Sequence, residues 1–73
     1  NARRLAEIAL QYRASAVILA HNHRSGVALP SVEDETSTAR LARALDLLGV
    51  ELSDHIIVAG NDYVSMREGG FMR

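Results

Sequence analysis

Residues 21–34 read HNHRSGVALPSVED and hold two histidines, a serine and an aspartate in a fixed spacing. His21 and His23 are one residue apart, Ser31 follows His23 after seven further residues, and Asp34 comes three positions later. Two imidazoles and a carboxylate, with a fourth position left to water, are the ligands of a catalytic zinc site. The stretch therefore predicts a metal site at His21, His23 and Asp34, with Zn²⁺ as the metal.

A short strand is expected immediately before the two histidines. Residues 16–20, AVILA, form an uninterrupted apolar run with two β-branched residues, which is typical of a strand buried on both faces. Residues two apart in an extended segment point to the same side. We therefore expect His21 and His23 to project together from the end of this strand.

The third ligand is expected from a helix over residues 32–48. Its core-facing residues follow the i, i+3, i+4, i+7 spacing and are Leu41, Ala44, Leu45 and Leu48. Asp34 lies seven positions before Leu41, so that at 3.6 residues per turn it falls on the same inner stripe. An unpaired carboxylate facing inward is costly, and a bound cation would offset that cost.

Ser31 and Asp34 also admit a purely structural interpretation. A serine before a helix with an acidic residue three positions later resembles a capping box, and helix chemistry alone favours this role. An acidic residue in the first turn is also favoured by the helix dipole. The seven-residue spacing from His23 favours a role in the site, and one hydroxyl can serve both purposes.

The pattern HxH, seven residues, SxxD resembles the core of the JAB/MPN (JAMM) metalloprotease motif. The segments HNHRSG, LPSVED, SDHIIV and DYVSM also resemble the bacterial RadC proteins, historically called DNA repair proteins. This resemblance implies an α/β (α+β) fold with a cytidine-deaminase-like mixed sheet flanked by helices. It further implies that zinc bound by His21, His23 and Asp34 serves hydrolysis of a peptide or isopeptide substrate, with Ser31 stabilising the oxyanion.

Two features depart from the family pattern. The family also uses a glutamate as general base, from an element well upstream of the histidines, but Glu7 is the only acidic residue before His21 and lies too close to it. Arg24 stands where RadC proteins usually carry proline, which makes the loop less rigid. We therefore expect residues 1–73 to be the C-terminal portion of one JAB/MPN domain, with the early strands and the base outside this sequence.

Three other functions are compatible with parts of the pattern: an HNH nuclease, an amidohydrolase and a non-catalytic DNA-associated module. In HNH nucleases the letters HNH name residues that are spread over a ββα unit, so three contiguous residues His-Asn-His do not indicate that fold. Amidohydrolases also use an HxH pair of metal ligands, but they need a barrel of about 250 residues, which a chain of 73 residues cannot form. A non-catalytic DNA-repair or recombination module, with a structural or vestigial metal site, rests on the RadC name alone. The net charge of −1 offers no electrostatic support for DNA as a partner.

The remaining segments predict a helix and a hairpin. Residues 1–13 form an amphipathic helix whose inner stripe is Leu5, Ile8, Ala9 and Tyr12. Residues 51–59 and 63–66 form strands joined by a turn at 60–62, after Gly49 ends the preceding helix. Asp54 and His55 are expected to be exposed and to interrupt the apolar pattern of the strand 51–59. For His55 we favour a role in supporting the metal ligands or the structure over a role as a fourth ligand. Residues 67–73 are expected to fray or to pair with sequence outside the chain.

Composition sets the cellular expectation. The sequence has no cysteine, which is compatible with a cytoplasmic protein without disulfides. It has no run of 18 apolar residues and no signal-like start, so we expect neither a membrane span nor export.

Overall fold

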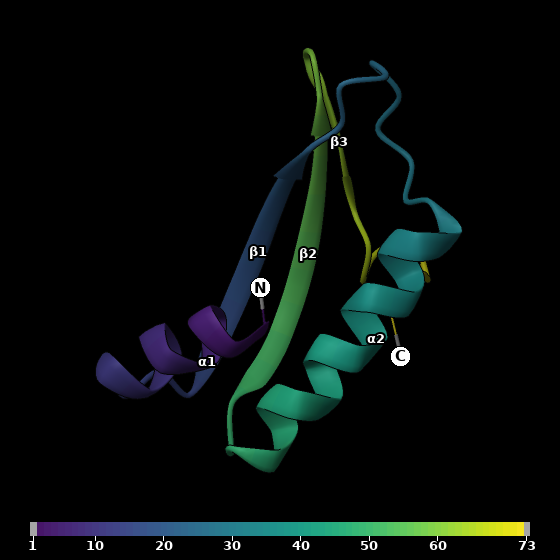
Figure 1. The fold of residues 1–73 in the computed structure, drawn as a ribbon. Helices are drawn as coiled ribbons and strands as arrows, with labels where there is room; N and C mark the ends of the chain where they lie inside the picture. Colours follow the sequence, from purple (N-terminus) through teal and green to yellow (C-terminus); the bar gives the residue numbers. More distant parts are fainter. Residues whose placement is uncertain (1, 73) are drawn as a thin grey trace.

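The computed structural model describes residues 2–72 and contains two helices and three strands. In chain order the elements are α1 (Ala2–Gln11), β1 (Ala16–Asn22), α2 (Val32–Leu47), β2 (Glu51–Ala59) and β3 (Asp62–Ser65). The strands form one sheet in the order β1-β2-β3, with β1 parallel to β2 and β3 antiparallel to β2 (Figure 1). This mixed α/β sheet confirms the expected fold class.

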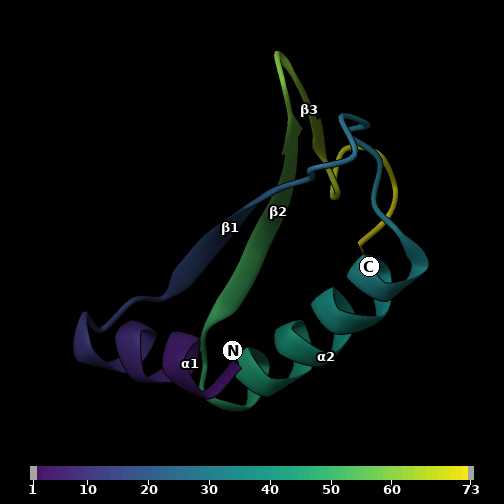
Figure 2. The same ribbon diagram turned by 45° about the horizontal axis from the view of Figure 1, so that its top comes forward.

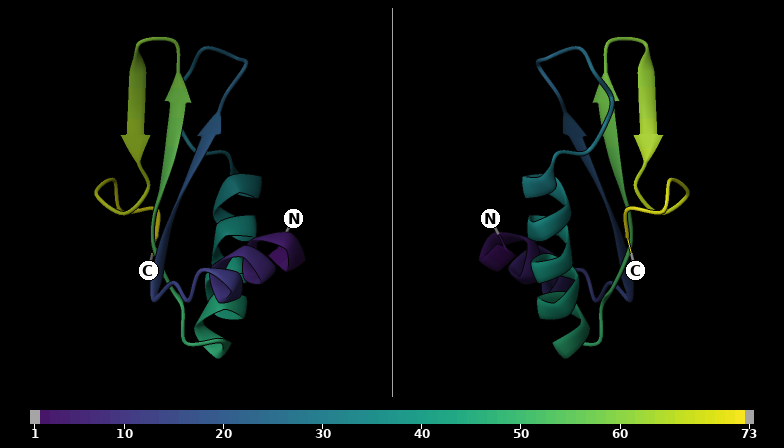
Figure 3. Two further views of the ribbon diagram at one scale, coloured as in Figure 1. Left: turned by 90° about the vertical axis from the view of Figure 1, so that its left-hand side faces the viewer. Right: turned by 90° about the vertical axis from the view of Figure 1, so that its right-hand side faces the viewer.

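Both helices lie on the same side of the sheet (Figure 3). The parallel pair β1 and β2 needs a crossover connection, and α2 provides it. A second view shows α1 and α2 meeting beneath the sheet, near the start of β1 and the start of β2 (Figure 2). The main core is therefore at this end of the molecule, and the opposite end of β1 is left for the histidines.

The core joins the two helices to one face of the sheet. Its buried members are Ala9, Leu45, Val50 and Leu52. Leu45 is fully buried and Leu41 is partly buried, as the helical spacing predicts. Leu48 is 44% exposed instead, because α2 ends at Leu47 and the chain turns at Gly49 with φ of +74°. Ala44, within α2, is also exposed and does not belong to the inner stripe. The prediction that Gly49 ends the helix is confirmed.

Strand β1 is buried on one face only, so the prediction of burial on both faces is wrong. Val17 and Leu19 pack against the core, whereas Ile18 is 66% exposed. The reason is the layering, since α1 and α2 both cover the same face. Within residues 2–72 no element covers the opposite face of β1.

The inner stripe of α1 is shorter than its spacing predicts. Leu5 and Ala9 contact the core, but Ile8 is 37% exposed and Tyr12 is 75% exposed. The helix ends at Gln11, and Arg13 adopts a φ of +53°, so the chain turns away before Tyr12 can reach the core. Tyr12 was therefore wrongly placed in the stripe.

A β-bulge interrupts the pairing of β1 with β2. Val17 pairs with Leu52, but Ile18 pairs with Asp54, so Ser53 is an extra residue on β2. Because side chains alternate along a strand, the extra residue shifts the inward-facing set by one position. The buried residues change accordingly from Leu52 before the bulge to Ile57 after it.

The C-terminal segment packs against the sheet, and the prediction that it frays is wrong for residues 67–72. The N–H of Gly69 donates to the carbonyl of Ser65 at 3.0 Å, and the N–H of Phe71 donates to that of Met66 at 2.8 Å. Asn1 and Arg73, which belonged to the predicted helix and tail, lie outside the described residues. No helix in the described part of the chain has the length and apolarity to cross a membrane.

Candidate metal centre

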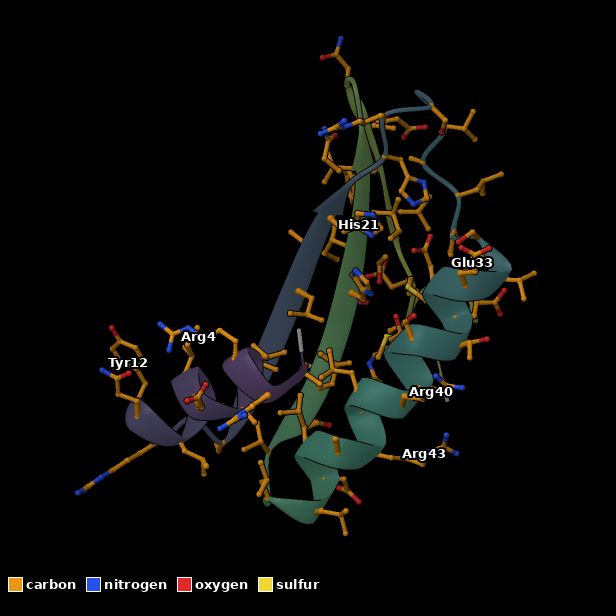
Figure 4. The ribbon with its side chains drawn as sticks, viewed as in Figure 1. Arg4, Tyr12, His21, Glu33, Arg40 and Arg43 are labelled. Carbon is orange, nitrogen blue, oxygen red and sulfur yellow. The ribbon has the colours of Figure 1, made fainter. Side chains whose placement is uncertain are left out.

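His21, His23 and Asp34 meet between the end of β1 and the first turn of α2. One ligand atom from each residue lies within 4.8 Å of the others. Figure 4 labels His21 at the end of β1 and Glu33 at the start of α2, and these mark the two elements that form the site. The structure thus brings together the three residues that the sequence predicts as metal ligands.

The His23 ring is held at both of its nitrogens. Its Nδ1 lies 3.2 Å from the carbonyl oxygen of Val27, and its Nε2 lies 2.8 Å from Oδ2 of Asp34. A carbonyl oxygen and an ionised carboxylate oxygen both accept, so each ring nitrogen donates to its partner. A metal at the site would replace the proton on Nε2, while the bond from Nδ1 to Val27 holds the ring in orientation, as is found for metal-binding histidines.

His21 is held less firmly. Its Nδ1 lies 3.6 Å from Oδ1 of Asp34, and its side chain is 41% exposed, against 15% for His23. The two imidazoles thus face different oxygens of one carboxylate. The remaining contacts of the His21 ring are a T-shaped one with His23, at 4.7 Å between centroids, and a stacked one with His55 at 5.7 Å.

Asp34 faces inward, as its helical phase predicts, with a side chain only 13% exposed. Burial raises the pKa of Asp34. This effect is outweighed by hydrogen bonds from the backbone and side chain of Ser31, by a hydrogen bond from His23 and by the nearby charge of His21. The pKa of Asp34 therefore lies below its ordinary value. The carboxylate is ionised at neutral pH, as a metal ligand must be.

Ser31 and Asp34 form the capping box that starts α2. The N–H of Ser31 donates to Oδ2 of Asp34 at 2.8 Å, and the N–H of Asp34 donates to Oγ of Ser31 at 3.0 Å. The structural interpretation of this pair is therefore correct. Oγ of Ser31 accepts in the cap, and its hydroxyl also donates to the Asp34 carboxylate, which helps to lower the pKa of Asp34.

His55 lies beside the predicted ligands, and the expectation that it is exposed is wrong. Its ring stacks on His21, and its Nδ1 lies 2.8 Å from Oγ1 of Thr38, which is 3% exposed. Burial lowers the pKa of His55, and the nearby charge of His21 lowers it further. The polar pair Asp54-His55, directly before the apolar run 56–59 of β2, was a sequence signal that this part of the strand has a special role. The bulge that orients it left no such signal.

Glu7, the acidic residue before the histidines, does not reach the site. It is exposed on α1, which leads into the start of β1, whereas His21 lies at the other end of that strand. Among residues 2–72, the only cluster of three or more possible metal ligands is His21, His23 and Asp34. The donor set fits a divalent metal such as zinc, since two imidazoles and a carboxylate leave one position open.

Comparison with known proteins gives consistent matches over almost the whole chain. The family model described as RadC-like JAB domain matches residues 1–71. UPF0758 protein Mmwyl1_0624 of Marinomonas sp. is 50% identical over 70 residues, covering 96% of this chain and 31% of that protein. UPF0758 protein IL0240 of Idiomarina loihiensis is 47% identical with the same coverage. UPF0758 protein YfjY of Escherichia coli is 46% identical, with 44% of its length covered. The chain thus spans less than half of these relatives.

Proposed function

The chain belongs to the RadC-like JAB domain family, and from this premise we propose that it carries the metal site of a zinc-dependent hydrolase of peptide or isopeptide bonds. The observation that carries the proposal is the meeting of His21, His23 and Asp34 at one point of the fold. The chain covers 31% of several relatives, so the activity of the whole protein is a proposal.

His21, His23 and Asp34 would hold the metal, and the hydrogen bonds of His23 and Asp34 already orient these two side chains toward the site. Zinc bound there would polarise a substrate carbonyl and lower the pKa of water to about 7. The hydrogen bond to Val27 keeps Nε2 of His23 directed into the site, where a metal would replace its proton. The cap keeps Asp34 ionised and oriented before any metal binds.

Ser31 would donate its hydroxyl proton to the carbonyl oxygen as negative charge develops on it. In this role the hydroxyl proton, which Ser31 gives to the Asp34 carboxylate in the free protein, would be donated to the substrate oxygen instead. The general base is proposed to be a glutamate outside residues 1–73, because Glu7 lies away from the site. We place the protein in the cytoplasm, on the cysteine-free sequence.

The non-catalytic DNA-associated module receives no specific support. The net charge is −1, and no nucleic-acid contact follows from the fold itself. DNA therefore remains a prediction that rests on the historical family name.

The decisive experiment measures zinc in the full-length protein, purified without chelator, beside a His21→Ala/His23→Ala double variant. We expect about one zinc per chain in the wild type and none in the double variant. Asn22→Ala is the matched control, because Asn22 is exposed and lies between the two histidines. Absence of metal from the wild type, even after zinc is supplied, would rule out the proposed function.

The role of Ser31 is tested on a protein shown to bind zinc. We expect Ser31→Ala to lower kcat for a peptide or isopeptide substrate by about 100-fold, with little change in KM, as for other oxyanion donors. Ser31→Thr keeps a hydroxyl and should retain most of the turnover. Equal kcat values for Ser31→Ala and the wild type would leave Ser31 as a helix cap only.

A further inference from the structure

We infer that His55, held by Thr38, positions the imidazole of His21 for metal binding. The inference rests on the proposed metal site. His55 would act as a positioning residue, distinct from the three ligands. Four features carry the inference: the weak restraint of His21, the bulge in β2, the buried hydroxyl of Thr38, and the hydrogen bonds that hold the bulge.

His21 needs support that the ligand cluster does not supply. His23 is held by hydrogen-bond contacts at both ring nitrogens, whereas the nearest approach of His21 to Asp34 is 3.6 Å, too long for a hydrogen bond. With its side chain 41% exposed, His21 could rotate away from the site. The stacked ring of His55, inclined by 29° to it, covers one face of the imidazole and restricts that rotation.

The bulge at Ser53 places His55 on the correct face of the sheet. After the bulge His55 pairs with Leu19, and Ile57 pairs with His21, so that these side chains share the face covered by α2. Without the extra residue, alternation would put Asp54 on this face and His55 on the opposite one. Bulges are frequent beside active sites, where they redirect a side chain.

Thr38 fixes the ring of His55 from the opposite side of the site. Its Oγ1 lies 2.8 Å from Nδ1 of His55 and also 3.7 Å from Sδ of Met66. The hydroxyl is buried in the middle of α2, where an unpaired polar group would be costly. The bond therefore links α2 to β2 and sets the plane of the ring that stacks on His21.

Two charged side chains hold the bulge in place. Asp54 accepts hydrogen bonds from the N–H of His55 at 2.7 Å and from the N–H of Arg67 at 3.1 Å. Arg67 in turn donates through Nε to the carbonyl of Ser53 and through Nη2 to the carbonyl of Leu52. These carbonyls flank the point where the strand register changes. The orientation of His55 is thus fixed by backbone contacts as well as by its own side chain.

The test measures the zinc dissociation constant of the full-length protein by competition with a chromophoric chelator. We expect His55→Ala to weaken zinc binding by about 10- to 100-fold, the usual effect of losing a residue that orients a ligand. Thr38→Val removes the hydroxyl at similar volume and should weaken binding about fivefold. His55→Phe keeps a stacking ring and should recover much of the affinity lost in His55→Ala.

The matched control is Ile56→Ala, next to His55 on β2 but on the opposite face. It should lower the midpoint of thermal unfolding without changing zinc affinity. With Co²⁺ in place of zinc, the visible absorption bands should shift in His55→Ala and stay unchanged in Ile56→Ala. The bands report the geometry around the metal, which a general loss of stability would leave unaltered.

The outcomes separate this inference from the proposed function. A wild-type protein that binds no zinc would overturn both. Wild-type zinc binding with unchanged affinity in His55→Ala and Thr38→Val would overturn the positioning role alone. An affinity in His55→Phe as low as that of a His21→Ala variant would overturn it as well, because His55 would then be a direct ligand.

Discussion

The two sides of the candidate metal centre are held by contacts of different range. On the loop side, the bonds join residues close in sequence: His23 to Val27 four apart, Ser31 to Asp34 three apart, and His23 to Asp34 eleven apart. On the sheet side, Thr38 and His55 are 17 residues apart, and their alignment depends on strand register. The loop side therefore exists as a sequence motif, whereas the sheet side is formed only by the fold.

The largest expected effect comes from the residue that holds the loop side together. Asp34→Asn keeps an oxygen that can accept from the N–H of Ser31 but loses the negative charge required at the metal. Since losing a supporting residue costs 10- to 100-fold, losing a ligand should weaken zinc binding by more than about 100-fold. The measurement is the zinc dissociation constant.

Glu33→Gln serves as the control for this change. Glu33 lies in the same first turn of α2 but is exposed, so its variant should bind zinc like the wild type. Equal affinities in Asp34→Asn and Glu33→Gln would show that the loop side is a helix cap without a metal function.

Zinc itself should stabilise the fold, because it joins the end of β1 to the start of α2. At a free zinc concentration 100 times the dissociation constant, the free energy of unfolding should rise by about 2.7 kcal/mol. Denaturant titration with and without zinc measures this increase, and the Asp34→Asn variant should show a rise of no more than about 0.4 kcal/mol at the same concentration. An equal rise in that variant would place zinc binding elsewhere.

The sheet side can be broken separately through Asp54. Burial raises the pKa of Asp54, but hydrogen bonds from Ser65, Arg67 and His55 and the charge of Arg67 bring it below its ordinary value. We expect Asp54→Ala to lower the free energy of unfolding at pH 7 by about 1–3 kcal/mol, as for hydrogen bonds to a charged group. Denaturant titration measures the loss.

The pH dependence of the Asp54 effect has a definite sign. A carboxyl group whose folded-state pKa is lowered contributes stability above its unfolded pKa of about 3.9, and that contribution is lost as pH falls through the folded value. The difference between wild type and Asp54→Ala should therefore be full at pH 7 and shrink below about pH 4. Asp62→Ala, an exposed aspartate on β3, is the control. A difference independent of pH would exclude the charged bonds as its cause.

The contrast between the two sides also explains what the sequence could predict. The bounds 51–59 of β2 agree with the prediction, and the end of α2 at Leu47 falls within one residue of it, since Gly49 and the capping box are local signals. The phase of Asp34 on α2 was predictable for the same reason. The assignment of segments as helix or strand, and the meeting of the three candidate ligands, could be predicted from residue patterns that are local in the sequence.

What sequence could not predict depends on neighbours distant in the chain. Ile18 is exposed because both helices pack on the other face of the sheet. Tyr12 is exposed because the chain turns at Arg13. The bulge at Ser53 lies in a strand without glycine or proline, so nothing local marks it. The face of the sheet on which His55 lies therefore follows only from the strand register.

The smallest expected effect concerns the cap. Ser31→Ala removes the acceptor for the N–H of Asp34 and should lower the free energy of unfolding by about 1 kcal/mol. Ser31→Thr should lose less, because threonine also caps helices. Denaturant titration at pH 7 without zinc measures both, and equal stability of Ser31→Ala and the wild type would show that the box does not stabilise α2.

The double use of Asp34 has an evolutionary consequence. Its carboxylate starts α2 through Ser31 and also faces both histidines, so two selective pressures act on one position. A descendant that no longer needs the metal would still need the helix start. Asparagine at this third helical position could still accept from the N–H of Ser31 without the charge, and Ser31 would be retained with it. Replacement of Asp34 by asparagine, with both histidines drifting freely, is therefore the sequence record that loss of the metal function should leave.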